Sequence, residues 1–306
     1  MRSIRIERVV LGAAVLIGCY SSAGQDTRAS LALHAGVDLV LVPVTLMDRR
    51  GALVTDLERQ HFTVLQDNNP QPIVSFSRED LPCTLGIVLD TSQSMSRELD
   101  MAKSLARDVL AMSEPRDDAF LASVSDQPEV IAPLTKDAAS VQSLLPFVKP
   151  GGNTALVDTI YMSLKQLRKA DNPRKALLVV SDGMDNNSRH SKGELMRMAV
   201  ESDVQIYTVS IGVPSRTAKA IVLREEREGL AFLNDLAANT GGLYSSVEFP
   251  NDARRVASAL GRALRDQYII GYTPVRSEST GQWHKIQIKL DVPKISVYSR
   301  TGYYSR

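Results

Sequence analysis

Three oxygen-bearing side chains follow a short apolar run in the first third of the sequence. Leu85 to Leu89 is almost wholly apolar, and after it come Asp90, Ser92 and Ser94 at alternate positions. An apolar run of this length that ends in polar residues is typical of a buried parallel strand. Open α/β sheets bind ligands beyond the carboxyl ends of such strands, and oxygen donors suit hard divalent cations. The stretch therefore predicts a cation site at the end of a strand.

Two later loops carry further oxygen donors of the same kind. Thr154 stands at the expected start of a helix, and Asp182 follows a second apolar run, Ala176 to Val180. Each loop alone has a simpler explanation, because Ser, Thr and Asp commonly cap helices or form turns. If the two apolar runs are neighbouring strands, however, Thr154 and Asp182 converge with the first loop. The three loops together then favour a cation site over separate caps and turns.

This combination resembles the von Willebrand factor type A (VWA) domain and its metal-ion-dependent adhesion site. The family pattern is Asp-x-Ser-x-Ser on a first loop, Thr on a second and Asp on a third. This sequence matches it at 90–94, at Thr154 and at Asp182. The resemblance covers about residues 83–266. More broadly, the chain is similar to bacterial exported VWA proteins, whose flanking β segments end in a similar Gly-Tyr-Tyr, here 302–304.

The resemblance implies a metal site with a ligand set that is rich in hydroxyls. It assigns Mg²⁺, with Mn²⁺ or Ca²⁺ as alternatives, to Asp90, Ser92, Ser94, Thr154 and Asp182. Neutral hydroxyls leave such an ion poorly neutralised, so it should attract an Asp or Glu from a protein partner. The resemblance therefore implies a binding protein that adheres or scaffolds, with no catalytic residues.

The pattern around these loops predicts the elements that position them. From Leu85 to about residue 266, apolar strands alternate with amphipathic helices, so we expect an α/β fold with a doubly wound, mainly parallel sheet and helices on both faces. Residues 119–124 and 129–134 could form a hairpin at an edge of this sheet. The predicted domain bounds are 83–266.

The flanking segments, 37–80 and 267–306, read as β strands. In the first, residues 62–65 and 73–76 flank the turn signal Asp67-Asn68-Asn69-Pro70. Each segment alone is too small to bury much core. We therefore expect them to combine into one small β-sandwich into which the α/β domain is inserted. Trp283 and the tyrosines of these segments would pack its core, or else form an exposed aromatic binding surface.

The N-terminus has the features of an export signal over residues 1–23. Three arginines (Arg2, Arg5 and Arg8) precede the apolar stretch Val9 to Gly18, which is shorter than the roughly 20 residues that span a bilayer. Leu-Ile-Gly before Cys19 resembles the lipobox of bacterial lipoproteins, in which the cysteine is acylated. Ordinary cleavage after Ala23 is the alternative. Residues 24–36 would be a tether, and the protein would act in the periplasm, envelope or extracellular space.

Composition narrows the classes of function. The chain has 306 residues, 43% hydrophobic and 23% charged, with a net charge of +1, so no basic excess points to nucleic acid. Apart from Cys19 the only cysteine is Cys83, so no disulfide is expected if Cys19 is lipidated or removed. We expect contact with a membrane only through a lipid anchor.

No motif of a known hydrolase or nucleotide-binding site is visible in the sequence. It has no GxSxG, HExxH or P-loop pattern, and the serines of the first loop have no obvious histidine base. Binding is therefore the favoured function. The alternatives are a non-catalytic subunit or regulator of an envelope enzyme complex, a hydrolase-like enzyme, and a VWA scaffold without metal.

Overall fold

The computed structural model describes residues 39–78, 80–212, 220–274 and 280–305. The expected export signal, Cys19 and the tether lie outside the described residues. None of the described helices has the length and apolar character needed to cross a bilayer.

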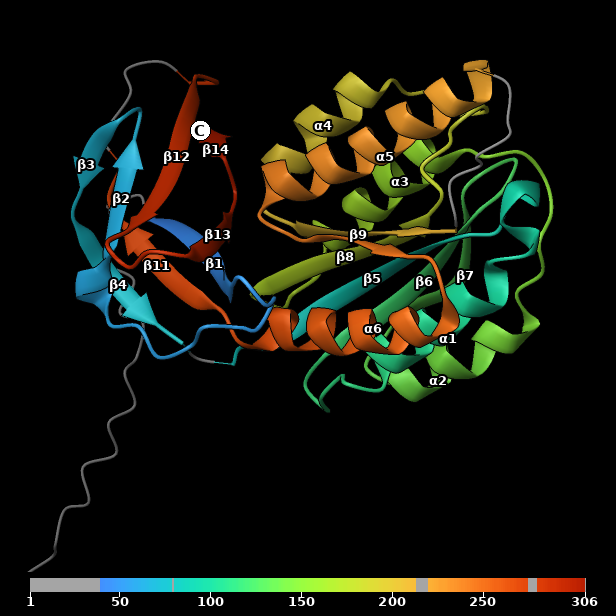
Figure 1. The fold of residues 1–306 in the computed structure, drawn as a ribbon, viewed down its shortest axis with the longest axis horizontal. Helices are drawn as coiled ribbons and strands as arrows, with labels where there is room; N and C mark the ends of the chain where they lie inside the picture. The colour runs from blue at the N-terminus through green and yellow to red at the C-terminus, as the bar shows by residue number, and fades with distance from the viewer. Residues whose placement is uncertain (1–38, 79, 213–219, 275–279, 306) are drawn as a thin grey trace, which may run out of the picture. The chain divides into compact units, whose positions relative to one another are not determined.

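The α/β region is built on a six-stranded sheet in the order β10-β9-β8-β5-β6-β7 (Figure 1). Its strands are β5 (Cys83–Asp90), β6 (Asp118–Val124), β7 (Glu129–Thr135), β8 (Arg174–Ser181), β9 (Gln205–Ile211) and β10 (Tyr244–Val247). All neighbours run parallel except β6 and β7, which form the expected antiparallel pair at the edge. The prediction of a mainly parallel sheet is confirmed.

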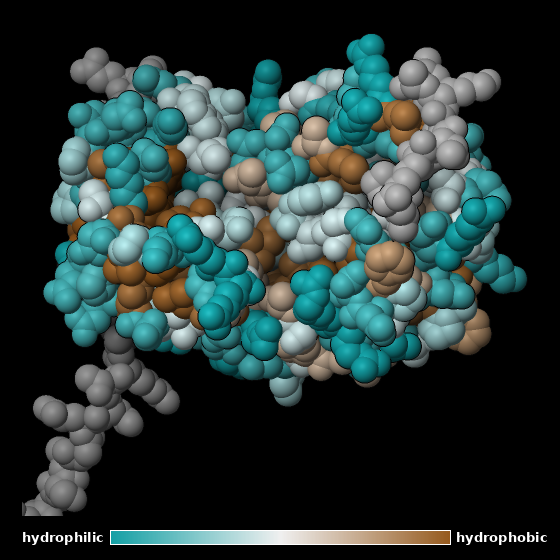
Figure 2. Space-filling model, viewed as in Figure 1, coloured by the Kyte–Doolittle hydropathy of each residue, from teal (hydrophilic) through white to brown (hydrophobic). Residues whose placement is uncertain are grey.

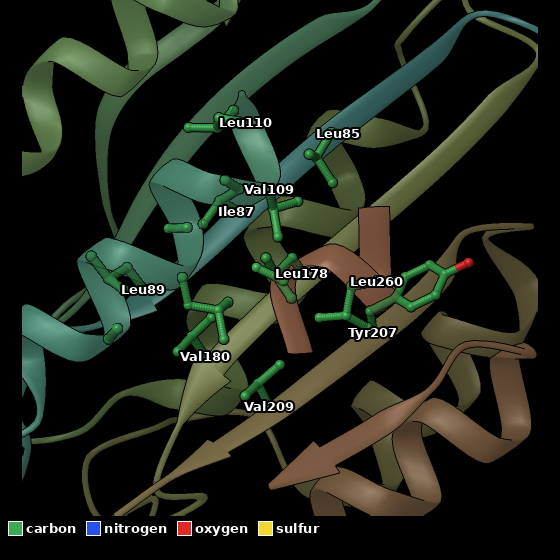
Figure 3. Close-up of a cluster of buried hydrophobic side chains, with 14 of the residues drawn as sticks. Leu85, Ile87, Leu89, Val109, Leu110, Leu178, Val180, Tyr207, Val209 and Leu260 are labelled. Carbon is green, nitrogen blue, oxygen red and sulfur yellow. The ribbon is translucent and has the colours of Figure 1, made fainter. Parts of the chain in front are cut away.

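Helices cover both faces of this sheet. One face carries α1 (Leu99–Leu110), α2 (Ala138–Leu144) and α6 (Pro250–Arg265). The other carries α3 (Leu156–Leu167), α4 (Lys192–Glu201) and α5 (Ala220–Thr240). Alternating side chains of β5 enter the two cores, with Leu85, Ile87 and Leu89 on the first side (Figure 3) and Val88 on the second. Burial on both faces explains why the strand is apolar throughout.

The flanking segments pair with each other in two antiparallel sheets. One has the order β13-β1-β11-β4 and the other β14-β12-β2-β3. The N-terminal segment supplies β1 (Val40–Asp48), β2 (Phe62–Gln66), β3 (Asn69–Gln71) and β4 (Ile73–Ser77). The C-terminal segment supplies β11 (Tyr268–Tyr272), β12 (Trp283–Leu290), β13 (Ile295–Ser299) and β14 (Gly302–Tyr304). One apolar core lies between the two sheets, so the expected sandwich around an inserted α/β fold is confirmed.

The local arrangement in the first β segment differs from the expectation. The turn occupies Asp67 and Asn68, both with positive φ (51° and 67°), and Asn69 and Pro70 already belong to β3. β3 pairs with β2, whereas β4 crosses to the other sheet and pairs with β11. Pro70 is tolerated because β3 is an edge strand.

Hydrophilic residues cover most of the face in Figure 2, while apolar ones gather where Figure 1 places β2, β4 and β11.

Candidate metal centre

The first loop is folded around the carboxylate of Asp90. This residue ends β5 and is fully buried. Its Oδ1 accepts hydrogen bonds from the backbone N–H of Ser92 at 3.0 Å and from the Ser92 hydroxyl at 2.6 Å. The hydroxyls of Ser92 and Ser94 are 3.1 Å apart. The alternation seen in the sequence therefore places all three side chains in one connected group.

The third loop joins this group from the neighbouring strand. β8 lies beside β5 in parallel register, so both strands end at the same edge of the sheet. The Ser94 hydroxyl donates to Asp182 Oδ2 at 2.7 Å, and the Ser181 hydroxyl donates to Asp90 Oδ2 at 2.5 Å. Ser94 is exposed and Asp182 is half-buried, whereas Asp90 is buried. The group therefore runs from the interior to the surface.

The second loop is tied to both of the others through its backbone. Gly151 N–H donates to the carbonyl of Thr91 at 2.7 Å, and the carbonyl of Gly152 accepts from Gln93 at 3.1 Å. The carbonyl of Thr154 accepts from two backbone N–H groups of the third loop, each at 3.0 Å. The Thr154 side chain is buried. Within the described part of the chain, no hydrogen bond joins its hydroxyl to the other four predicted side chains.

The negative charges of Asp90 and Asp182 are not balanced by a nearby basic side chain among the described residues. Burial and then the charge of Asp182 raise the pKa of Asp90 to about 6, against the opposing effect of the hydrogen bonds from Ser181 and Ser92. Neither aspartate takes part in the ion pairs found among residues 39–78, 80–212, 220–274 and 280–305. A buried carboxylate without a cation is costly. A bound cation would supply the missing positive charge.

The donor set decides which cations fit. It contains two carboxylates and three hydroxyls, all of them oxygen donors, which suit Mg²⁺ or Ca²⁺ better than soft metals. The described residues include no group of three or more His, Cys, Asp or Glu side chains that could hold a metal ion. The hydroxyls are therefore essential to this candidate site, since the carboxylates alone are too few.

Two further side chains of the third loop have structural roles. Asp185 is partly buried and accepts hydrogen bonds from Val157 N–H at 3.2 Å and from the Ser188 hydroxyl at 2.5 Å. It thus caps α3, whose own N-cap residue is an alanine. His190 is partly exposed and contacts Asp158 through Nδ1 at 2.6 Å.

Sequence reasoning missed Ser181 and the contact between Gly183 and Gly229. A Cβ on Gly229, which lies within α5, would stand 2.6 Å from the Gly183 carbonyl oxygen. Gly183 itself has φ +84°. The helix therefore packs directly on the backbone beside Asp182. An isolated glycine inside a helical pattern was the available signal, because it often marks a close approach.

Comparison with known proteins concerns the fold that carries this candidate site. The family model of the von Willebrand factor type A domain matches residues 85–184. An uncharacterized protein of Borreliella burgdorferi is 25% identical over 180 residues, 53% of this chain and 52% of its own length. The chain thus spans about half the length of this curated relative.

Solved structures show the same fold. A von Willebrand factor type A protein from Catenulispora acidiphila superposes with a TM-score of 0.51 at 10% identity, over 88% of this chain and 73% of that one. Proximal thread matrix protein 1 from the mussel byssus, with a zinc-occupied MIDAS motif, gives 0.50 at 13% identity, over 67% and 50%. Together with the sheet order, the family match at residues 85–184 shows that the α/β region has a fold like that of the von Willebrand factor type A domain.

Proposed function

We propose that the α/β domain is a metal-dependent module that binds a protein partner. In this proposal Asp90, Ser92, Ser94, Thr154 and Asp182 hold Mg²⁺, with Mn²⁺ or Ca²⁺ as alternatives. The observation that carries it is the buried carboxylate of Asp90, which is hydrogen-bonded to hydroxyls and lies near a second carboxylate, with no ion pair to a basic side chain among the described residues.

The ligand set also indicates the chemistry of the partner. Three of the five proposed ligands are neutral hydroxyls, so they place donors around the ion without cancelling its charge. Ser94 lies at the exposed end of the group, where a partner can approach. An Asp or Glu of the partner would supply both the missing charge and a further oxygen donor. The byssus protein holds zinc at its MIDAS motif, which supports a metal at the corresponding place in this fold.

The described histidines support binding rather than catalysis. His61 contacts Asp291, His190 contacts Asp158 and His284 contacts Asp67, each through Nδ1. None of them contacts Ser92 or Ser94 among the described hydrogen bonds, so none of the described histidines is placed to act as a general base for these hydroxyls. An adhesion or scaffolding role therefore explains the site with fewer assumptions than hydrolysis.

We also propose that the protein is exported and acts in the cell envelope or outside the cell. The basic residues, the apolar stretch and Cys19 at the N-terminus support this location. If Cys19 is lipidated, Cys19→Ala should move the protein from the membrane fraction to the soluble fraction. A wild-type protein that is already soluble after cell lysis would contradict lipidation while leaving export itself intact.

A titration with Mn²⁺ tests the metal site. We expect Asp182→Ala and Ser94→Ala to weaken Mn²⁺ binding by about tenfold or more, since each removes a proposed ligand. Ser96→Ala is the matched control, because its exposed hydroxyl donates to the carbonyl of Gln93 in the same short turn and bonds to no proposed ligand among the described residues. Unchanged affinity in both ligand variants, with folding verified by circular dichroism, would refute the site. Partner capture should then be compared with and without EDTA.

A further inference from the structure

Strand β12 carries a row of exposed side chains on the outer face of the sandwich. Its burial alternates strictly from Trp283 to Lys289. The inward residues Ile286 and Ile288 belong to the core. The outward row consists of Trp283, Lys285, Gln287 and Lys289. Figure 1 shows β12 beside β2, and the register places Thr63 of β2 opposite Lys289 on the same face.

The aromatic end of this row is held in place. Trp283 lies opposite Tyr304 of β14, with the ring centroids 5.0 Å apart and the planes at 59°. A Cβ on Gly302 would stand 2.3 Å from Cζ2 of Trp283, so the indole rests directly on the backbone there. The side chain nevertheless remains 37% exposed. Tyr268 and Tyr272 are buried as expected, whereas Trp283 lies outside the apolar core between the two sheets.

The rest of the row is cationic. Lys285 and Lys289 are exposed and lie about 13 Å apart along the strand, with Gln287 between them. Neither lysine takes part in an ion pair with another described residue. The nearby carboxylate of Asp67 is engaged by His284 and by the backbone N–H of Lys285. Both positive charges are therefore available to an external anion.

From these observations we propose that the outer face of β12 binds an acidic polysaccharide. The aromatic pair offers π faces to the C–H face of a sugar ring. The Gln287 amide can donate to and accept from hydroxyls, and the two lysines pair with carboxylates spaced along the polymer. Because Trp283 is already fixed by Gly302 and Tyr304, little side-chain freedom is lost on binding. The face lies on the sandwich and is independent of the proposed metal site.

Charge complementarity favours an acidic glycan over a neutral glycan and over nucleic acid. A neutral glycan would leave both lysines unpaired. Nucleic acid usually requires an extended basic surface, whereas this chain has a net charge of only +1. The short row of one aromatic pair, one amide and two lysines matches a polymer with alternating neutral and acidic sugars.

Intrinsic fluorescence provides a direct test, since Trp283 is the only tryptophan of the chain. The full chain is titrated in EDTA with hyaluronan oligosaccharides, with dextran as a neutral polymer and with oligo-dT as a nucleic acid. We expect hyaluronan to change the Trp283 emission saturably, and Lys285→Gln with Lys289→Gln to weaken binding about tenfold or more. Dextran should have no effect. The Trp283 variants lack the fluorophore, so their hyaluronan binding is measured by calorimetry. Trp283→Ala should abolish this binding, and Trp283→Phe should retain part of it.

A matched pair of lysine substitutions serves as control. Lys136→Gln with Lys169→Gln removes the same charge from exposed positions outside the sandwich, and it should leave hyaluronan affinity within about twofold of the wild type. The proposal is overturned if hyaluronan gives no response, if the control pair weakens binding as much as the β12 pair, or if dextran or oligo-dT binds as tightly. Because EDTA is present, these outcomes do not depend on the metal site.

Discussion

At the scale of single residues, serine hydroxyls position the carboxylates of the candidate metal site. Asp90 accepts from the hydroxyls of Ser92 and Ser181, one on each carboxylate oxygen, and Ser94 donates to Asp182. Ser181 also accepts from the backbone N–H of Gly183 at 2.9 Å. It is not among the predicted metal ligands, yet it connects the carboxylate of the first loop to the backbone of the third.

We therefore expect Ser181→Ala to lower the free energy of unfolding by about 1–3 kcal/mol, since it leaves one buried acceptor and one buried donor short of a partner. It should also weaken Mn²⁺ binding, although the residue is not a proposed ligand. Urea unfolding and Mn²⁺ titration measure the two effects. Ser143→Ala, which removes an exposed hydroxyl from α2, is the control. Equal stability of the two variants would show that Ser181 is dispensable.

The surroundings of Asp117 should make the free energy of unfolding depend on pH. Burial alone would raise its pKa, but hydrogen bonds from Arg265 and from the backbone N–H groups of Glu114 and Cys83 outweigh burial and lower it below 3.8. The folded state therefore keeps the carboxylate ionised at lower pH than the unfolded state does. The resulting stabilisation is complete above the unfolded pKa and disappears as the pH falls through the folded pKa.

Asp117→Asn should accordingly reduce the free energy of unfolding by roughly 3 kcal/mol near neutral pH, because Arg265 loses a buried partner. The difference from the wild type should narrow below about pH 4. Urea unfolding at several pH values measures it, with the exposed Asp171→Asn as control. A difference that stays constant down to about pH 3 would contradict a lowered pKa for Asp117.

The sequence was informative about the ligands and less so about their supports. Asp90, Ser92, Ser94 and Asp182 could be grouped because their loops follow apolar runs that predict neighbouring strands. The sequence did not identify Ser181 as a support of the site, because this residue continues the strand and its hydroxyl could have pointed to either face of the sheet. The cap formed by Asp185 on α3 likewise depends on how two loops meet, which no local pattern contains.

At the scale of elements, α5 supports the third loop through contact between two glycines. Gly229 is buried within the helix and touches the backbone of Gly183. Helical periodicity predicted the helix, but a glycine in its interior is unfavourable for the helix itself. The contact explains the residue, because any side chain at this position would meet the loop that carries Asp182.

Gly229→Ala should therefore destabilise the protein by about 1–3 kcal/mol through overpacking, although helix propensity alone favours alanine. It should also weaken Mn²⁺ binding by displacing the loop beside Asp182. Gly193→Ala in α4 is the matched control, because a Cβ there would come no closer than 4.0 Å to the Ser191 hydroxyl. Thermal unfolding and Mn²⁺ titration distinguish the variants. A stabilising effect of Gly229→Ala would show that the loop can move aside at little cost.

At the scale of the whole described chain, the sandwich depends on both flanking segments. β1 pairs only with β11 and β13 among the described strands, and β4 pairs only with β11. The small size of each segment predicted this joint sandwich. The assignment of β4 to the opposite sheet from β2 and β3 was not predictable, because it follows from a crossing near residue 72 rather than from alternation within the strands.

Deletion of residues 267–306 should consequently unfold the N-terminal β segment, since β1 and β4 lose every strand partner they have among the described residues. We expect rapid proteolysis within residues 40–77 of the truncated protein, with slower cleavage of residues 83–265. Limited proteolysis followed by mass spectrometry measures both. Equal protection of residues 40–77 in the truncated and full-length chains would contradict mutual dependence of the segments.

The pairing of the two flanking segments also has a consequence for the order of events during folding. The whole α/β region separates β1 from its partner β11 in the sequence, so these two strands are far apart in the unfolded chain. An ion pair between Arg265 and Asp80, with an N···O distance of 3.3 Å, joins the two ends of that region. Once the region has folded, its two ends lie close together, and most of the entropy of closing a long loop has already been lost. We therefore expect the inserted region to fold before the domain that surrounds it, and in refolding from urea the α/β region should gain protection from proteolysis before residues 40–77 do.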